Sequence, residues 1–267
     1  MKKLVIVIGP TRTGTSSAWT ALRDFRLEFL SLSLSKENYF FHTDYNSERY
    51  CCCFDNQTDY IFDLAPSLFH RDGALANLAR LEVKKSVYVV LRKPSELYRS
   101  SYQYNLQNSK HGMSFEEYLT DNVFDRFSYE KRLAKINELM PDTEIKFLLF
   151  SELTTNMPLV LSEIIRTEFD ICLTGLSLAK THHVNKSGVT YRFGAVLQIA
   201  KFIGKRIPGL KNFVLTKINW VRVREIFFEK NSVDPVDFSL SPHKVNRIAY
   251  EDEYFSTLAS NYYSARE

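Results

Sequence analysis

The sequence predicts an α/β fold of three layers, in which helices cover both faces of a central, mainly parallel sheet. Short runs of apolar, β-branched residues alternate with segments of helical period, which is typical of βαβ units. The first of these runs leads directly into a Gly-rich turn and then a helix. A chain of 267 residues with 45% apolar content is also long enough to bury a core of this kind.

Five strands are expected, at residues 4–8, 30–34, 60–64, 86–91 and 145–150. In the second, leucines alternate with serines, which predicts one apolar face. The fourth (SVYVVL) is apolar throughout, as expected of a central strand covered on both sides.

Helical periodicity joins these strands. The first helix is expected at 16–25, where Ala18, Ala21, Leu22 and Phe25 share one face. Further helices are expected near residues 95–104, 115–120, 128–139 and 159–169.

Composition excludes several classes of function. The net charge is only +4, so the bulk charge does not demand a nucleic-acid partner. The apolar start is too short for a secretory signal, and no apolar run reaches the roughly 18 residues of a membrane span. Cys51, Cys52 and Cys53 are adjacent and badly placed for mutual disulfides, and lack a ligand pair at metal spacing. We therefore expect a soluble, cytoplasmic protein without a metal site.

The segment 192–224 differs from the rest, with eight Lys or Arg residues and no acid. It is interpreted as the solvated face of a helical region, with contact to an anionic membrane or a polyanion as the alternative. The predicted division is an α/β core at 1–191 and a basic helical extension at 192–267 packed on it, or one domain spanning 1–267.

Between the first strand and the first helix lies segment 9–17 (GPTRTGTSS). Glycines let backbone N–H groups converge on an anion at the positive end of a helix. Thr13, Thr15, Ser16 and Ser17 add hydroxyl donors. The sequence therefore predicts a phosphate-binding loop.

The loop departs from that of ATP- and GTP-binding proteins, in which Lys and then Ser or Thr follow the second glycine. Here Thr15 and Ser16 follow Gly14, and the cation of the loop is Arg12. Without the lysine, a magnesium-bound triphosphate loses its main charge partner. This favours a smaller anion held by amides, hydroxyls and one guanidinium.

At these residues the chain resembles the sulfotransferases that use 3'-phosphoadenosine 5'-phosphosulfate (PAPS). Their first motif has Lys or Arg, then Ser or Thr, then Gly-Thr, and residues 12–16 (RTGTS) match it. The second motif starts with Arg at a strand end and has Ser eight residues on, as Arg92 and Ser100 do. The resemblance implies that Arg12 and the loop hold the 5'-phosphosulfate, and that Arg92 and Ser100 hold the 3'-phosphate. The product would be 3'-phosphoadenosine 5'-phosphate (PAP).

Residues 36–41 (KENYFF) are similar to the K-E-x-x-F-F segment of the carbohydrate sulfotransferases, including the heparan type. This similarity implies that Glu37 is the general base and that the acceptor is a saccharide or glycolipid. His42 and His70 are the competing bases. Residues 63–66 (DLAP) look like the acidic-x-x-Pro segment near the acceptor of that family, with Leu64 where some members have Lys.

Near residue 186 a further pattern resembles a cofactor loop, which implies that Lys186 and Arg192 contact the nucleotide phosphates. The predicted function is thus sulfuryl transfer from PAPS to a hydroxyl or amine, with Glu37 and Arg12 as catalytic residues. The alternatives are a P-loop nucleotide kinase, a non-catalytic nucleotide-binding module and a membrane-associated protein.

Overall fold

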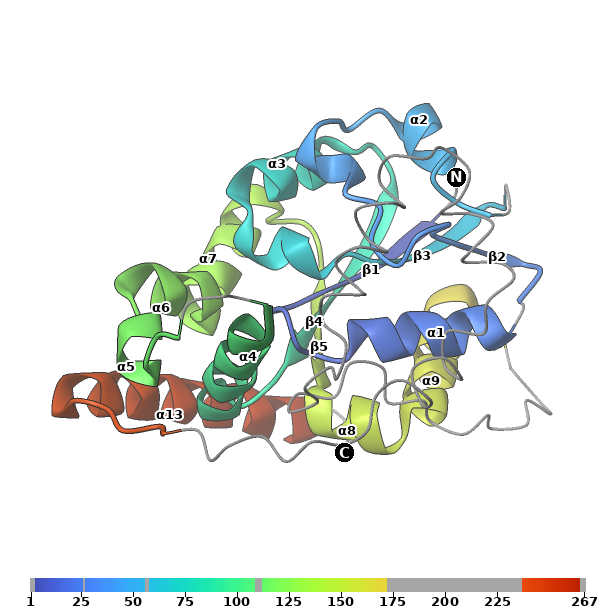
Figure 1. The fold of residues 1–267 in the computed structure, drawn as a ribbon. Helices are drawn as coiled ribbons and strands as arrows, with labels where there is room; N and C mark the ends of the chain where they lie inside the picture. Colours follow the sequence, from blue (N-terminus) through green and yellow to red (C-terminus); the bar gives the residue numbers. More distant parts are fainter. Residues whose placement is uncertain (1–2, 26, 56–57, 109–111, 172–236, 265–267) are drawn as a thin grey trace, which may run out of the picture. The chain divides into compact units, whose positions relative to one another are not determined.

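The computed structural model describes residues 3–25, 27–55, 58–108, 112–171 and 237–264. Within them lies one sheet of five strands in the order β2-β3-β1-β4-β5 (Figure 1). All four strand pairings are parallel, which confirms the predicted fold class. The strands are β1 (Lys3–Ile8), β2 (Leu30–Leu32), β3 (Tyr60–Leu64), β4 (Lys84–Leu91) and β5 (Ile145–Leu149).

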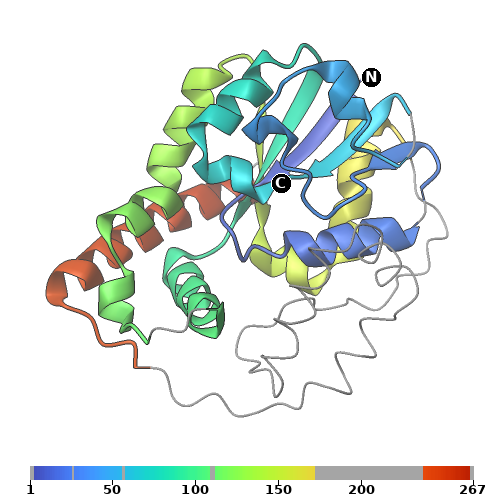
Figure 2. The ribbon, with the colours of Figure 1, turned by 45° about the horizontal axis from the view of Figure 1, so that its top comes forward.

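Helices cover both faces of this sheet. Figures 1 and 2 show α1 and α9 on one side, and α3 and α7 on the other. The helices are α1 (Thr15–Phe25), η1 (Phe40–His42), α2 (Ser47–Cys51), η2 (Pro66–His70), α3 (Asp72–Arg80), α4 (Pro94–Asn108), α5 (Phe115–Tyr118), α6 (Asp121–Phe127), α7 (Tyr129–Leu139), α8 (Phe150–Thr155), α9 (Met157–Phe169) and α13 (Pro242–Ser264), where η marks a 3-10 helix.

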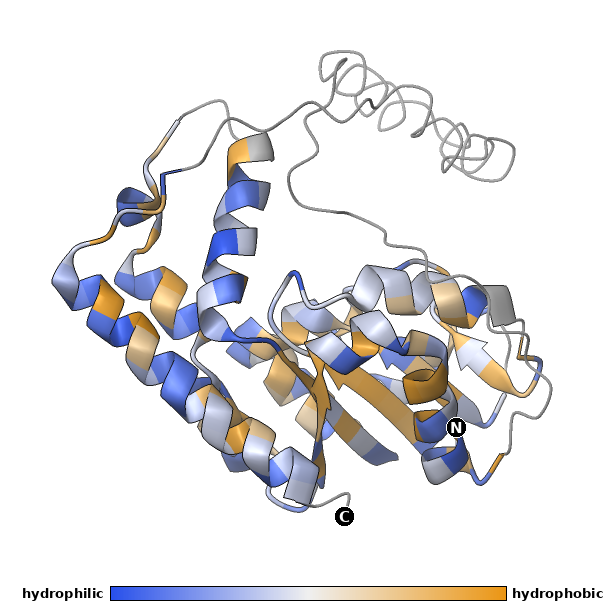
Figure 3. Ribbon diagram, turned by 90° about the horizontal axis from the view of Figure 1, so that it is seen from below, coloured by the Kyte–Doolittle hydropathy of each residue, from blue (hydrophilic) through white to orange (hydrophobic). Residues whose placement is uncertain are grey.

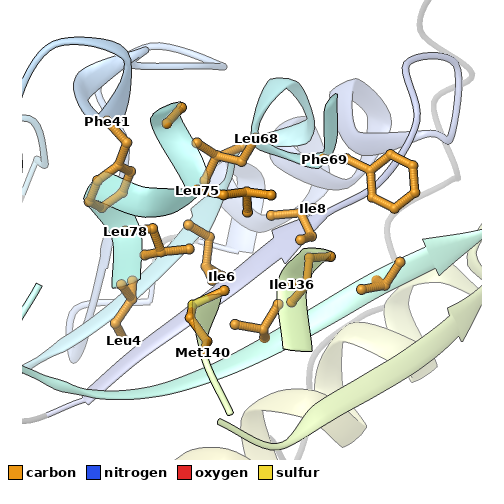
Figure 4. Close-up of a cluster of buried hydrophobic side chains, with 14 of the residues drawn as sticks. Leu4, Ile6, Ile8, Phe41, Leu68, Phe69, Leu75, Leu78, Ile136 and Met140 are labelled. Carbon is orange, nitrogen blue, oxygen red and sulfur yellow. The ribbon is translucent and has the colours of Figure 1, made fainter. Parts of the chain in front are cut away.

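The alternation of side chains along β1 divides the core in two. Leu4, Ile6 and Ile8 point into the cluster beneath α3 and α7, part of which is drawn in Figure 4. Val5 and Val7 point into the cluster beneath α1 and α9. The strands of the sheet are largely hydrophobic (Figure 3), and each fully buried side chain of this size contributes about 1.5–3 kcal/mol to stability.

Two expected strands end earlier than the sequence suggests. The strand expected at 30–34 covers only β2, and Leu34 is 65% exposed. Ser31, expected on a polar face, is buried, and the hydrogen bond between its hydroxyl and Thr58 Oγ1 at 2.8 Å offsets the cost of that burial. Phe150, expected at the end of a strand, is instead the first residue of α8.

The carboxyl ends of β1 and β4 lie side by side, because Ile8 pairs with Val89. The chain leaves β1 toward α1 on one face of the sheet, whereas β4 leads through α4 to α7 on the other. Adjacent parallel strands whose connections diverge in this way form the usual ligand site of an open α/β sheet. Both predicted phosphate motifs begin at this point.

The described residues up to Tyr102, those from Met113 to Ile171 and those from Phe238 onward belong to one compact unit. The described part of the C-terminal region is helical, as expected, and consists mainly of α13. The expected domain boundary near residue 192 lies outside the described residues and stays a prediction. None of the helices in the described ranges combines the length and apolarity needed to cross a membrane.

Candidate functional site

The loop after β1 is tightly folded against β4. A Cβ atom on Gly9 would lie 3.0 Å from the Val90 carbonyl oxygen and 3.2 Å from its Cβ, so glycine is required for this close approach. Gly14 and Arg12 both have left-handed φ angles, 78° and 75°. Such a conformation is costly for Arg12, a type of strain that concentrates at functional sites.

Within the loop, Thr13 has a structural role. Its side chain is fully buried and its hydroxyl donates to the Pro10 carbonyl at 2.7 Å. The loop then enters α1 at Thr15, and the Ser17 and Ala18 amides both bond the Gly14 carbonyl. The start of α1 therefore presents the positive end of a helix dipole at the predicted phosphate site.

Arg92 follows β4 directly, and its side chain binds the backbone of the phosphate loop. Its Nη1 donates to the Arg12 carbonyl at 2.7 Å, and its guanidinium lies over the Phe150 ring at 4.3 Å. Its Nε is buried and has no hydrogen-bond partner among the described residues, with Glu96 Oε2 3.7 Å away. Tyr129 fixes the Arg92 backbone, donating to its carbonyl at 3.1 Å and accepting from its amide at 2.7 Å.

Ser100 lies two turns along α4 and is buried. Arg12 Nε donates to its hydroxyl at 3.4 Å, a long hydrogen bond. The structure thus brings Arg12, Arg92 and Ser100 together, although 88 residues separate the first from the last. The two motifs therefore meet in the structure, while their roles toward a nucleotide stay predictions.

Glu37 lies in the segment after β2 and is half-buried. Its Oε1 accepts a hydrogen bond from the Ser67 amide at 2.9 Å, which orients the carboxylate. The Ser67 hydroxyl is in turn 2.9 Å from His42 Nε2. Two of the three candidate bases therefore meet at Ser67, which the first turn of η2 supplies.

Electrostatics links these groups to the phosphate loop. Desolvation lowers the pKa of His42, Arg71 lowers it further, and Glu37 opposes both. Desolvation also lowers the pKa of Lys36, which Glu37 raises and Arg12 lowers. Since such effects require proximity, the Glu37 carboxylate lies near both His42 and Lys36, and Lys36 lies near Arg12.

His70, the third candidate base, lies at the end of η2 beside several cations. Its Nε2 is 3.1 Å from Arg126 Nη2. Burial lowers its pKa to about 3, and Arg126, Arg71 and Arg132 add to the shift. A neutral imidazole that accepts from a guanidinium is a poor proton acceptor, so the structure favours Glu37 or His42 over His70.

Sequence reasoning missed Ser67, Tyr129 and Phe150, which orient the predicted site residues. Pro66 at the start of η2 and Phe150 directly after β5 were the available signals. Lys186 and Arg192 lie outside the described residues. The described ranges contain no group of three or more His, Cys, Asp or Glu side chains able to hold a metal.

Comparison with known proteins identifies the fold. A sulfotransferase from Alicyclobacillus acidocaldarius superposes with a TM-score of 0.51 at 13% identity, covering 83% of this chain and 99% of that chain. The chain has the fold of a sulfotransferase. A sulfotransferase domain from the curacin biosynthetic pathway gives 0.49 at 11% identity, over 69% and 79% of the two chains. A mouse sulfotransferase complexed with PAP gives 0.41 at 12% identity, over 75% and 64%. No family model and no curated protein matches the sequence.

Proposed function

We propose that the protein is a sulfotransferase that moves a sulfuryl group from PAPS to a hydroxyl or amine. The observation that carries this proposal is the convergence of Arg12, Arg92 and Ser100 at the carboxyl ends of β1 and β4. A phosphate loop with an arginine in place of the usual lysine suits a donor without a triphosphate. The fold shared with a sulfotransferase supports the same conclusion.

The residues fit the two anionic ends of PAPS. The phosphosulfate would lie at the start of α1, where Arg12, the loop amides and the hydroxyls of Thr15 and Ser16 would bind it. Arg92 and Ser100 would hold the 3'-phosphate. The buried Arg92 Nε, which lacks a hydrogen-bond partner among the described residues, is a donor suited to an anionic oxygen.

The proposed reaction is one in-line substitution at sulfur. Glu37 takes the proton of the acceptor O–H or N–H while the acceptor atom bonds to sulfur. The bond between sulfur and the bridging oxygen breaks, and its electron pair leaves on the 5'-phosphate of PAP. Arg12 and the helix dipole stabilise this developing charge.

The K-E-x-x-F-F resemblance supports a saccharide or glycolipid acceptor, and we propose this class together with a cytoplasmic location. The basic segment 192–224 would add contact with an anionic membrane or polyanion, with binding that weakens as salt rises.

Thermal unfolding with nucleotides tests the proposal. PAP at about 100 times its dissociation constant stabilises the fold by about 2.7 kcal/mol, which raises the unfolding midpoint by roughly 5–10 °C. Arg92→Ala should lose most of this shift. Arg99→Ala is the matched control, because Arg99 lies one residue before Ser100 on α4 yet is exposed and stacks on Phe238.

A larger shift with magnesium and ATP than with PAP would contradict the proposal and favour a kinase. If PAP raised the unfolding midpoint equally in the Arg92→Ala variant and in the wild type, the nucleotide would bind outside the predicted site.

A further inference from the structure

Asp63 is a carboxylate in the apolar core, one residue before the end of β3. Its side chain is 0% exposed, and it points to the same face of β3 as Ile61, which belongs to the cluster beneath α3. Its Oδ1 atom is buried and has no hydrogen-bond partner among the described residues. A buried, incompletely paired carboxylate destabilises a fold, so packing does not explain an acid at this position.

The other oxygen of Asp63 connects two elements. Oδ2 accepts from the Tyr50 hydroxyl at 2.6 Å and from Asn38 Nδ2 at 3.1 Å. The Asn38 Oδ1 atom in turn accepts from the Phe40 amide at 2.9 Å. Asn38 therefore joins the buried carboxylate to the backbone of the turn that follows it.

That turn is strained, and Glu37 lies directly before it in the chain. Tyr39, directly after Asn38, has a left-handed backbone with φ 55°, which costs energy in a non-glycine residue. The two Asn38 hydrogen bonds and the burial of Phe41 hold this conformation. Glu37 directly precedes Asn38 and depends on the same turn to reach the Ser67 amide.

Packing alone does not need the carboxylate. The Tyr50 ring contacts the Phe41 ring, with 4.7 Å between centroids, and the Phe54 ring at 4.9 Å, and these contacts would persist with an apolar residue at position 63. The Asn38 amide and the buried Tyr50 hydroxyl, however, both need an acceptor at this position. We propose that Asp63 is a positioning residue that holds Glu37 in place through Asn38. This inference rests on the proposed role of Glu37 as the base.

The imidazole of His42 offers a readout that needs no acceptor. Its pKa is lowered by desolvation and by Arg71 and raised by Glu37, so it reports where the Glu37 carboxylate lies. Measured by NMR, Glu37→Gln should lower the His42 pKa, because the substitution removes the negative charge that raises it. Asp63→Ala should lower it in the same direction, because the carboxylate moves away.

A double-mutant cycle separates positioning from a general structural effect. In the Glu37→Gln background, Asp63→Ala should leave the His42 pKa unchanged, since no carboxylate remains to be moved. The same cycle applies to PAP release from labelled PAPS with water as the acceptor. Asp63→Ala alone should slow release about 10- to 100-fold, because small misplacements of a reacting group cost that much, and should add nothing to Glu37→Gln.

Two further variants keep the test decisive if Asp63→Ala does not fold. Asn38→Ala leaves the buried carboxylate intact and should reproduce both effects even if Asp63→Ala fails to fold. Tyr50→Phe removes the other hydrogen bond of Asp63 and should leave both readouts close to wild type. The inference is overturned if Asn38→Ala leaves His42 unchanged, or if Asp63→Ala acts equally in both backgrounds. If Glu37→Gln leaves PAP release unchanged while the His42 cycle behaves as expected, the role of Glu37 as base fails and the positioning geometry stands.

Discussion

Glu37 and Asp63 are two carboxylates near the carboxyl edge of the sheet, and their surroundings differ. Asp63 is fully buried, whereas Glu37 is half-buried, oriented by the Ser67 amide and close to both His42 and Lys36. An oriented, partly accessible carboxylate can take a proton from an acceptor, which a carboxylate sealed in the core cannot do.

We therefore expect Glu37→Gln to slow sulfuryl transfer by about 10²- to 10⁴-fold, because Gln keeps the shape but cannot accept a proton. PAP binding, measured by calorimetry, should hardly change. Arg12→Ala should weaken PAP binding and transfer together, since its charge acts on the phosphate. Glu48→Gln in α2 is the matched control for loss of one exposed acid. Normal turnover in the Glu37→Gln variant would contradict the role of Glu37 as base and leave His42 as the next candidate.

At this scale the sequence named the residues of both motifs but not the contacts between them. The phosphate-loop pattern and the Arg92–Ser100 spacing named the groups that converge. The contact of Arg92 with a backbone carbonyl of the loop, and its stacking on Phe150, depend on β4, β5 and the loop being packed together. No local pattern contains that information, because the residues lie far apart in the chain.

At the scale of elements, α9 is tied to the amino ends of the sheet strands by one acid. The Glu168 carboxylate accepts from Lys3, Lys146, Ser86 and Tyr88, at distances of 2.5–2.7 Å, and its side chain is 2% exposed. Burial alone would raise its pKa, but bonds from Lys146, Lys3, Tyr88 and Ser86 lower it to about 2. A single side chain thus connects β1, β4 and β5 to α9.

The sign of the pH effect follows from this lowered pKa. An acid whose pKa is lower in the folded protein stabilises the fold above its unfolded value of 4.5, and this stabilisation is lost as pH falls toward 2. The full effect is about 3 kcal/mol, of which somewhat less than half is lost by pH 3.5. Glu168→Gln should reduce the free energy of unfolding at pH 7, measured in urea, by about 2–4 kcal/mol. The difference from wild type should shrink at pH 3.5, and a constant difference would contradict the assignment.

Among the elements, the long apolar strands β1 and β4 were predicted almost to the residue. In the segment from η1 to α3, β3 was predicted at its observed bounds, but the helices were not predicted, because short helices such as α2 depend on tertiary contacts more than on periodicity. In that segment the Tyr50 ring packs between Phe40, Phe41 and Phe54, and its hydroxyl bonds Asp63. The expected β2 was too long because the Leu/Ser alternation continues past the point where pairing with β3 stops.

At the scale of the whole molecule, the C-terminal helix α13 supports the nucleotide motif near the middle of the chain. Tyr254, Phe255 and Leu258 pack against the core cluster beneath α7. Asp252 Oδ1 accepts from the Ser95 amide at 2.9 Å, at the start of α4. Since Pro94 has no amide proton, Ser95 carries the first amide of that helix, and α13 provides its cap. α4 carries Ser100, so a residue at the far end of the sequence is joined to the predicted 3'-phosphate site.

We expect Asp252→Ala to lower the free energy of unfolding by about 1 kcal/mol, the usual cost of losing a helix cap. It should also weaken PAP binding, because α4 would no longer be held at its first turn and Ser100 would lose its alignment with Arg92. Asp252→Asn is the matched control, since it removes the ion pair with Lys93 at 3.6 Å but keeps an acceptor oxygen for the Ser95 amide. Calorimetry with PAP and chemical unfolding measure the two effects on the same samples. If Asp252→Ala loses stability yet binds PAP as wild type does, α13 supports the fold without supporting the nucleotide site, and Ser100 is held in place by α4 and its own neighbours.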